Sequence, residues 1–145
     1  LQASVMEYLR TERPRVLYLG FGETDEWAHS GKYDRYLATA HRVDGFIRDL
    51  WQAMQAMPEY AGKTTFIITT DHGRGSGADD WTSHGERIDG AEHIWMAVLG
   101  PDTAPLGVRS DLNVTQSQTA ATVAHLLGLD WCAAEERAAK PLPLR

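Results

Sequence analysis

Apolar residues follow two patterns along the chain: continuous runs in some segments and a helical spacing in others. Nearly continuous apolar runs, typical of strands covered on both faces, occur at Arg15–Phe21, Thr64–Thr70 and Ile94–Leu99. Apolar residues at three-and-four spacing, typical of amphipathic helices, occur at residues 1–13, 32–57 and 115–127. Pro14, Pro58 and Gly128 follow the three predicted helices and are expected to end them. The C-terminal tail, with Pro141 and Pro143, is expected to run extended along the surface.

Strands separated by helices favour an α/β fold with a mostly parallel sheet, covered by helices as a three-layer sandwich. In such sheets ligands collect outside the carboxyl ends of the strands. The 145 residues contain no repeat and no domain boundary, and their length fits a single domain, residues 1–145.

Composition narrows the classes of partner. The formal net charge of -6 argues against binding of nucleic acid or of an anionic membrane, because both need a basic face. It leaves a phosphate-bearing substrate possible, since bound cations would reverse the local field. Cys132 is the single cysteine, which excludes a disulfide framework and a cysteine-based zinc site. No apolar run has the length of a membrane span. The chain opens at Leu1 without an initiator methionine or a leader, so we expect it to be part of a longer protein.

Three groups of aspartate and histidine follow the predicted strands or lie in nearby loops. Asp25 and His29 are four residues apart, so one helical turn would direct both side chains to the same side. Asp71 and His72 are adjacent and can converge only where the strand has ended, which Gly73 allows. His84 follows in a glycine-rich loop. Carboxylate oxygen and imidazole nitrogen are ligands of divalent zinc, so the three groups together predict a metal centre at one edge of the sheet.

Each group alone also fits a role without metal. Asp25 could cap a helix, His29 could be a surface histidine, and the aspartate and glycine around His72 could form a turn. His84 could be a loop histidine, and His93 competes with it as a ligand because it directly precedes a predicted strand. Spacing alone does not choose between His84 and His93. The joint placement of the groups favours metal binding.

Other polar and aromatic residues near these groups leave alternatives open. Arg74 and Arg87 could clamp an anion beside the metals or could be solvated loop residues. Trp27 and Trp81 could stack on a substrate ring, although core tryptophans are the simpler interpretation. His125 falls within a predicted helix and is expected to be packed or solvated rather than a ligand.

The motifs resemble, in order, those of the alkaline phosphatase superfamily, and more closely its type I phosphodiesterase/nucleotide pyrophosphatase and phosphonoacetate hydrolase branches. Asp25-Glu26-Trp27-Ala28-His29 is similar to the Asp-x-x-Gly-His element, with Ala28 where glycine is usual. Val43 to Ile47, Thr70 to Gly73, Ser83 to Gly85 with Gly100-Pro101, and the helix with Leu127-Gly128-Leu129 are similar to later motifs of the family. The likeness runs from about Val16 to about Asp130.

The resemblance implies an alkaline phosphatase-like fold and two divalent ions, zinc by preference, with manganese or iron as alternatives. It assigns Asp25, His29 and His84 to one ion and Asp71 with His72 to the other. It places a serine or threonine nucleophile on an earlier strand that nothing here matches. The chain is therefore expected to be the C-terminal part of a larger metallohydrolase domain and inactive alone.

The expected function is two-metal hydrolysis of phosphate mono- or diesters of small molecules. A sulfatase of the same superfamily is an alternative, although sulfatases usually lack the element formed here by Asp25 and His29. A non-catalytic α/β metal-binding module is an alternative of another class. Export to the periplasm or beyond is favoured over the cytoplasm by the resemblance. The sequence does not determine the substrate or the oligomeric state.

Overall fold

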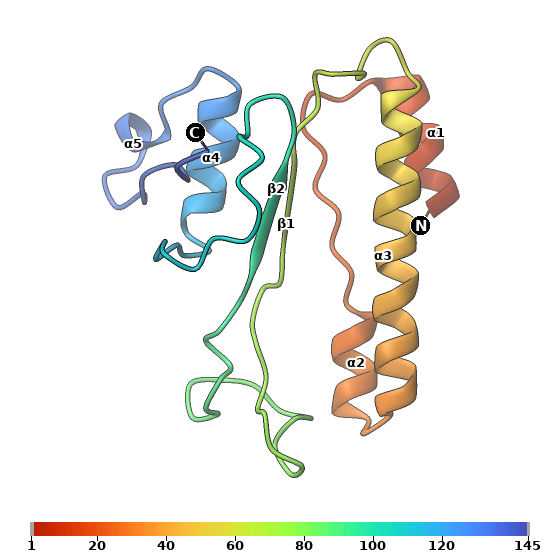
Figure 1. Ribbon diagram of the computed structural model, residues 1–145, viewed down its shortest axis with the longest axis vertical. Helices are drawn as coiled ribbons and strands as arrows, with labels where there is room; N and C mark the ends of the chain where they lie inside the picture. Colours follow the sequence, from red (N-terminus) through yellow and green to blue (C-terminus); the bar gives the residue numbers. More distant parts are fainter. Residues whose placement is uncertain (1, 145) are drawn as a thin grey trace. The chain divides into compact units, whose positions relative to one another are not determined.

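A computed structural model describes residues 2–144 as two compact units (Figure 1). The first unit consists of residues 2–62 and 72–93, and the second consists of residues 63–71 and 94–144. The segment 72–93 thus belongs with the N-terminal residues, although the second unit precedes and follows it in the chain. The polypeptide therefore passes three times between the units.

Three helices build the first unit: α1 (Gln2–Glu12), α2 (Glu23–His29) and α3 (Tyr33–Gln55). The helices predicted at residues 1–13 and 32–57 are confirmed. The buried side of α3 is formed by Thr39, Phe46, Leu50 and Met54, which recur at intervals of seven or four residues as one helical face requires. Tyr33 and Leu37, which the pattern placed inward, are exposed. No described helix is long and apolar enough to cross a bilayer.

Helix α2 packs against the N-terminal half of α3 (Figure 1). Arg42 of α3 donates hydrogen bonds to the Glu23 carboxylate at 3.0 Å and to the Thr39 hydroxyl at 2.9 Å. The Phe21 ring, just before α2, meets the edge of the Phe46 ring with their centroids 5.9 Å apart. These contacts fix the position of α2, which carries Asp25 and His29.

The strand predicted at Arg15–Phe21 does not form. The segment is extended but pairs with no strand among residues 2–144, and Val16 and Tyr18 are 51% and 89% exposed. An apolar run indicates that side chains are suited to burial, whereas a strand also needs a neighbour for its N–H and C=O groups. The sequence of this segment shows that its side chains suit burial. It does not show whether a partner strand is available.

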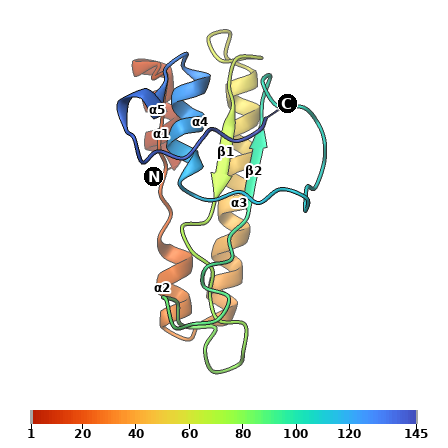
Figure 2. The same cartoon turned by 90° about the vertical axis from the view of Figure 1, so that its left-hand side faces the viewer.

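The second unit contains a two-stranded sheet of β1 (Phe66–Thr69) and β2 (Met96–Leu99). The strands run in opposite directions (Figure 2), with Phe66 opposite Leu99 and Thr69 opposite Met96. The expectation of a mostly parallel sheet is therefore wrong for the described residues, although the α/β class holds. Because the chain leaves β1 and enters β2 at the same end of the pair, no crossover connection is needed. Both strands are half-buried rather than fully covered.

Helices α4 (Gln118–Leu126) and α5 (Trp131–Ala134) complete the second unit. Helix α4 confirms the prediction at residues 115–127, and α5 was not predicted. Gly128 follows α4 with φ +77°, a conformation that favours glycine, and its N–H donates to the His125 carbonyl at 2.9 Å. The tail is extended as predicted, but it is not merely a surface segment, because Leu142 is buried.

The contact between α4 and the tail leads to a stability prediction. The buried Thr122 hydroxyl accepts a hydrogen bond from the Leu142 N–H at 2.8 Å and donates one to the Gln118 carbonyl at 2.7 Å. We expect Thr122→Val to lower the free energy of unfolding by about 1–3 kcal/mol, because it leaves the Leu142 N–H without its partner. Urea unfolding followed by circular dichroism measures the change.

A matched control lies one turn earlier in the same helix. The buried Thr119 hydroxyl has no hydrogen-bond partner within the described part of the chain. We expect Thr119→Val to change the free energy of unfolding by less than about 0.5 kcal/mol, or to raise it, since no bond is lost. Equal effects of the two substitutions would show that the Thr122 bond to the tail does not contribute.

Candidate metal centre

Helix α2 brings Asp25 and His29 to the same side of the first unit. They lie four residues apart in the helix, and His29 Nε2 is 3.3 Å from Asp25 Oδ2. This contact follows from the helical period, since residues i and i+4 are neighbours on a helix surface. Both side chains are partly exposed, as residues that receive a ligand from solvent must be.

The loop of residues 72–93 carries His72 and His84 and is closed on itself. The Gly73 N–H donates to the Ala91 carbonyl at 2.7 Å, and the Gly75 N–H donates to the Ser83 carbonyl at 3.2 Å. There is no room for a side chain at residue 73, because a Cβ there would overlap the carbonyl oxygens of Gly90 and His93. The close approach of two backbone segments therefore requires glycine at residue 73. The same contact fixes the backbone position of the adjoining His72.

Asp25, His72 and His84 converge within the first unit. His84 Nε2 lies 3.6 Å and His72 Nε2 lies 3.8 Å from Asp25 Oδ1, and the ligand atoms of the three residues all lie within 4.8 Å of one another. The rings of His72 and His84 stack with their centroids 3.7 Å apart. His29 Nε2 adjoins the group, 3.1 Å from His84 Nε2.

The donor set has the chemistry of a zinc site. Ligands held about 2.0–2.1 Å from zinc in a tetrahedral arrangement lie about 3.3 Å from one another. The separations from Asp25 Oδ1 to His84 Nε2 and His72 Nε2, 3.6 and 3.8 Å, are near that value, and His29 Nε2 lies 3.3 Å from the other Asp25 oxygen. The donor types of these residues therefore suit a divalent ion. The geometry groups His72 with Asp25 and His84, whereas the family resemblance assigns it to the second ion.

The two remaining candidates are Asp71 and His93. Asp71 belongs to the second unit, where its backbone carbonyl accepts a hydrogen bond from the Gln116 side-chain amide at 3.2 Å. The His93 side chain is 80% exposed, with its Nε2 3.6 Å from a Glu92 carboxylate oxygen. Of the two histidines that competed in the sequence, the structure thus brings His84 to Asp25.

Arg74 is bound beside the candidate ligands rather than solvated. Its Nη2 donates to Asp25 Oδ1, its Nη1 donates to the Trp81 carbonyl at 3.1 Å, and its side chain is 14% exposed. The Trp81 ring packs edge-on against Tyr33 and Tyr36 of α3, at centroid distances of 5.3 and 6.4 Å. Trp81 therefore anchors the loop on α3, and Arg74 connects the anchored loop to Asp25.

A hollow of about 690 Å³ opens next to these histidines. His72 and His84 form part of its wall, and residues between Gly85 and Glu92 form the rest, including the exposed Arg87. Sequence reasoning did not identify this wall. A usable signal was the pair Gly85 and Gly90, whose φ angles of +122° and +92° favour glycine and which bracket the turn that builds it.

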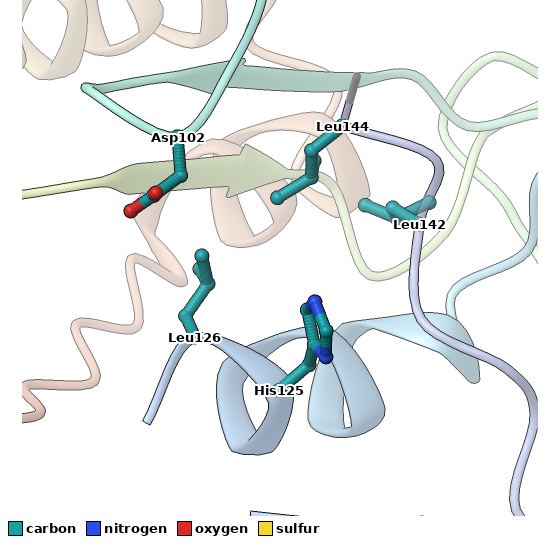
Figure 3. A pocket seen from close by; sticks show the side chains of 5 residues that line it. All are labelled: Asp102, His125, Leu126, Leu142 and Leu144. Atoms are coloured by element: carbon teal, nitrogen blue, oxygen red, sulfur yellow. The ribbon is translucent and has the colours of Figure 1, made fainter. Parts of the chain in front are cut away.

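A separate hollow of about 400 Å³ lies in the second unit (Figure 3). Its lining residues are Asp102, His125, Leu126, Leu142 and Leu144. His125 is exposed on α4, so of the two expectations, packed or solvated, the second holds. Among residues 2–144, the group of three metal-ligand side chains is the one in the first unit, formed by Asp25, His72 and His84.

An α/β chain with converging aspartate and histidine side chains is a candidate metalloprotein. The chain belongs to the Metalloenzyme superfamily, whose family model matches residues 2–131. This superfamily is alkaline phosphatase-like, and most of its members are metal-dependent enzymes of the hydrolase or mutase type. No curated protein and no solved structure matches the chain.

Proposed function

We propose that the chain carries metal-binding residues of a two-metal hydrolase that acts on phosphate mono- or diesters of small molecules. The observation that carries the proposal is the convergence of Asp25, from a helix, with His72 and His84, from the start and the middle of one loop. Membership of the superfamily supports metal dependence. The finer assignment to a phosphodiesterase or phosphatase rests on the order of the sequence motifs.

The proposed roles follow the resemblance to the alkaline phosphatase superfamily. Asp25, His29 and His84 hold one ion, and His72, with Asp71, holds the other. Two ions bound there would supply a lowered pKa for the attacking hydroxyl or water and a positive field for the leaving oxygen. Arg87 lines the adjacent hollow and would meet the negative charge of a phosphate ester. Zinc suits these ligands, and manganese or iron are alternatives.

The nucleophile is proposed to be a serine or threonine outside these 145 residues, together with the remaining ligands of the second ion. This part of the proposal rests on the resemblance, which places both on an earlier strand of the same domain. The 145 residues alone are then expected to bind metal without turning over an ester.

The test is hydrolysis by the full gene product. We expect turnover of bis-p-nitrophenyl phosphate or p-nitrophenyl phosphate that a chelator abolishes and added zinc restores, and a loss of kcat/KM of at least about 100-fold in His84→Ala. Turnover of p-nitrophenyl sulfate instead would favour the sulfatase alternative. Metal binding without turnover of any of the three esters would favour the non-catalytic module.

A further inference from the structure

Arg74 contacts the same carboxylate oxygen that the two stacked histidines approach. Asp25 Oδ1 accepts a hydrogen bond from Arg74 Nη2, and it is also the oxygen nearest to His72 Nε2 and His84 Nε2. Asp25 is the one anionic residue in the converging group of three, since imidazoles bind metals as neutral ligands. The Arg74 guanidinium and a metal ion at this position would therefore both be attracted to the single negative charge of Asp25.

We propose that Arg74 adjusts the charge of the metal centre, weakening its hold on the cation and strengthening its hold on an anionic ligand. This inference rests on the proposed function and names the ligand class that the site favours, a phosphoryl or other tetrahedral oxyanion. It does not need Arg74 to move.

The weaker binding of the cation follows from Coulomb repulsion. Arginine keeps its positive charge at every physiological pH, so a divalent ion beside Asp25 meets a fixed like charge. Arg74 is only 14% exposed, which limits the screening of this repulsion by solvent. Removal of the charge should therefore tighten cation binding. A side chain that acted only by orienting Asp25 would have the opposite effect, since loss of such support typically weakens metal binding about 10–100-fold.

The stronger binding of an anionic ligand follows from the hydrogen-bond donors of the guanidinium. Arg74 has five N–H groups, and bonds to Asp25 and to the Trp81 carbonyl use one hydrogen on each of two nitrogens. The bond to Trp81, whose ring is packed on α3, holds the group in place. A fixed guanidinium next to a bound cation gives an oxyanion two positive partners, and charge-assisted bonds of this kind are roughly twice as strong as neutral ones.

The experiment compares zinc and phosphate binding in Arg74→Gln, in which a polar group replaces the charge. Zinc affinity is measured by isothermal titration, and inorganic phosphate binding to the zinc-loaded chain is measured by ³¹P NMR. We expect zinc to bind at least about 5-fold more tightly and phosphate at least about 10-fold more weakly than in the unmodified chain. Arg48→Gln is the matched control, since Arg48 is exposed on α3 and pairs with Asp49, and both affinities should change less than about 2-fold.

Arg74→Lys keeps the inference testable if Arg74→Gln does not fold. Because lysine retains the charge, zinc affinity should stay within about 3-fold of that of the unmodified chain. Weaker zinc binding in either variant, or unchanged phosphate binding in Arg74→Gln, overturns the inference and leaves the proposed function standing. Failure of the unmodified chain to bind zinc overturns both.

Discussion

Replacement of His84 by alanine is expected to weaken zinc binding at least about 100-fold, because two or three ligands remain where a zinc site needs three or four. His72→Ala should have an effect of the same order, since His72 Nε2 lies at nearly the same distance from Asp25 Oδ1, 3.8 Å against 3.6 Å. Isothermal titration of the folded chain with zinc measures both affinities.

His93→Ala is the control for this prediction. It removes the same side chain nine residues later in the same segment, where the imidazole is 80% exposed and adjoins Glu92. We expect its zinc affinity to stay within about 2-fold of that of the unmodified chain. An equal loss in His93→Ala and His84→Ala would show that zinc binds unspecifically to surface histidines. An unchanged affinity in His84→Ala would remove that residue from the metal centre.

Replacement of Gly73 by alanine is expected to lower the free energy of unfolding by about 3 kcal/mol or more, beyond ordinary overpacking, because backbone atoms must shift. The new Cβ would overlap the carbonyl oxygens of Gly90 and His93. The same shift would displace the adjoining His72, so zinc binding should weaken in parallel. Urea unfolding and zinc titration of one preparation measure the two effects.

Gly22→Ala provides the comparison for Gly73→Ala. A Cβ at Gly22 meets no heavy atom within 4 Å, and its φ of -97° is open to any residue. Gly22 is the N-cap of α2, where alanine is less favourable than glycine, so we expect the free energy of unfolding to fall by no more than about 1 kcal/mol, with unaltered zinc binding. If both substitutions prove equally mild, the close crossing of residues 73 and 90–93 does not form in solution.

The helices of this protein could be read from the sequence because their signal is local. Helix α3 was predicted to within about two residues at each end from apolar spacing and Pro58, and α4 from its spacing and Gly128. The juxtaposition of Asp25 and His29 followed from the same period, since four residues make about one helical turn. In each case the atoms that interact are close along the chain.

Strand pairing could not be read in this way. Arg15–Phe21 has as continuous an apolar run as Thr64–Thr70, yet the first segment stays unpaired within the described residues and the second contributes β1. Whether a run becomes a strand depends on a partner that is remote in the sequence, and so does its direction. The antiparallel pairing of β1 with β2, against the expected mostly parallel sheet, is a consequence of that dependence.

The sequence determined by itself which residue types could bind a metal and which of them share a helix turn. The resemblance of its motifs already favoured His84 over His93. Only the tertiary structure decided that His72 joins Asp25 and His84, and that Arg74 shares the Asp25 carboxylate. The reason is the closed loop of residues 72–93, whose course is set by backbone bonds and by the packing of Trp81 on α3. Contacts between residues some 50 positions apart depend on the path of this loop, and the spacing of residues along the chain does not encode that path.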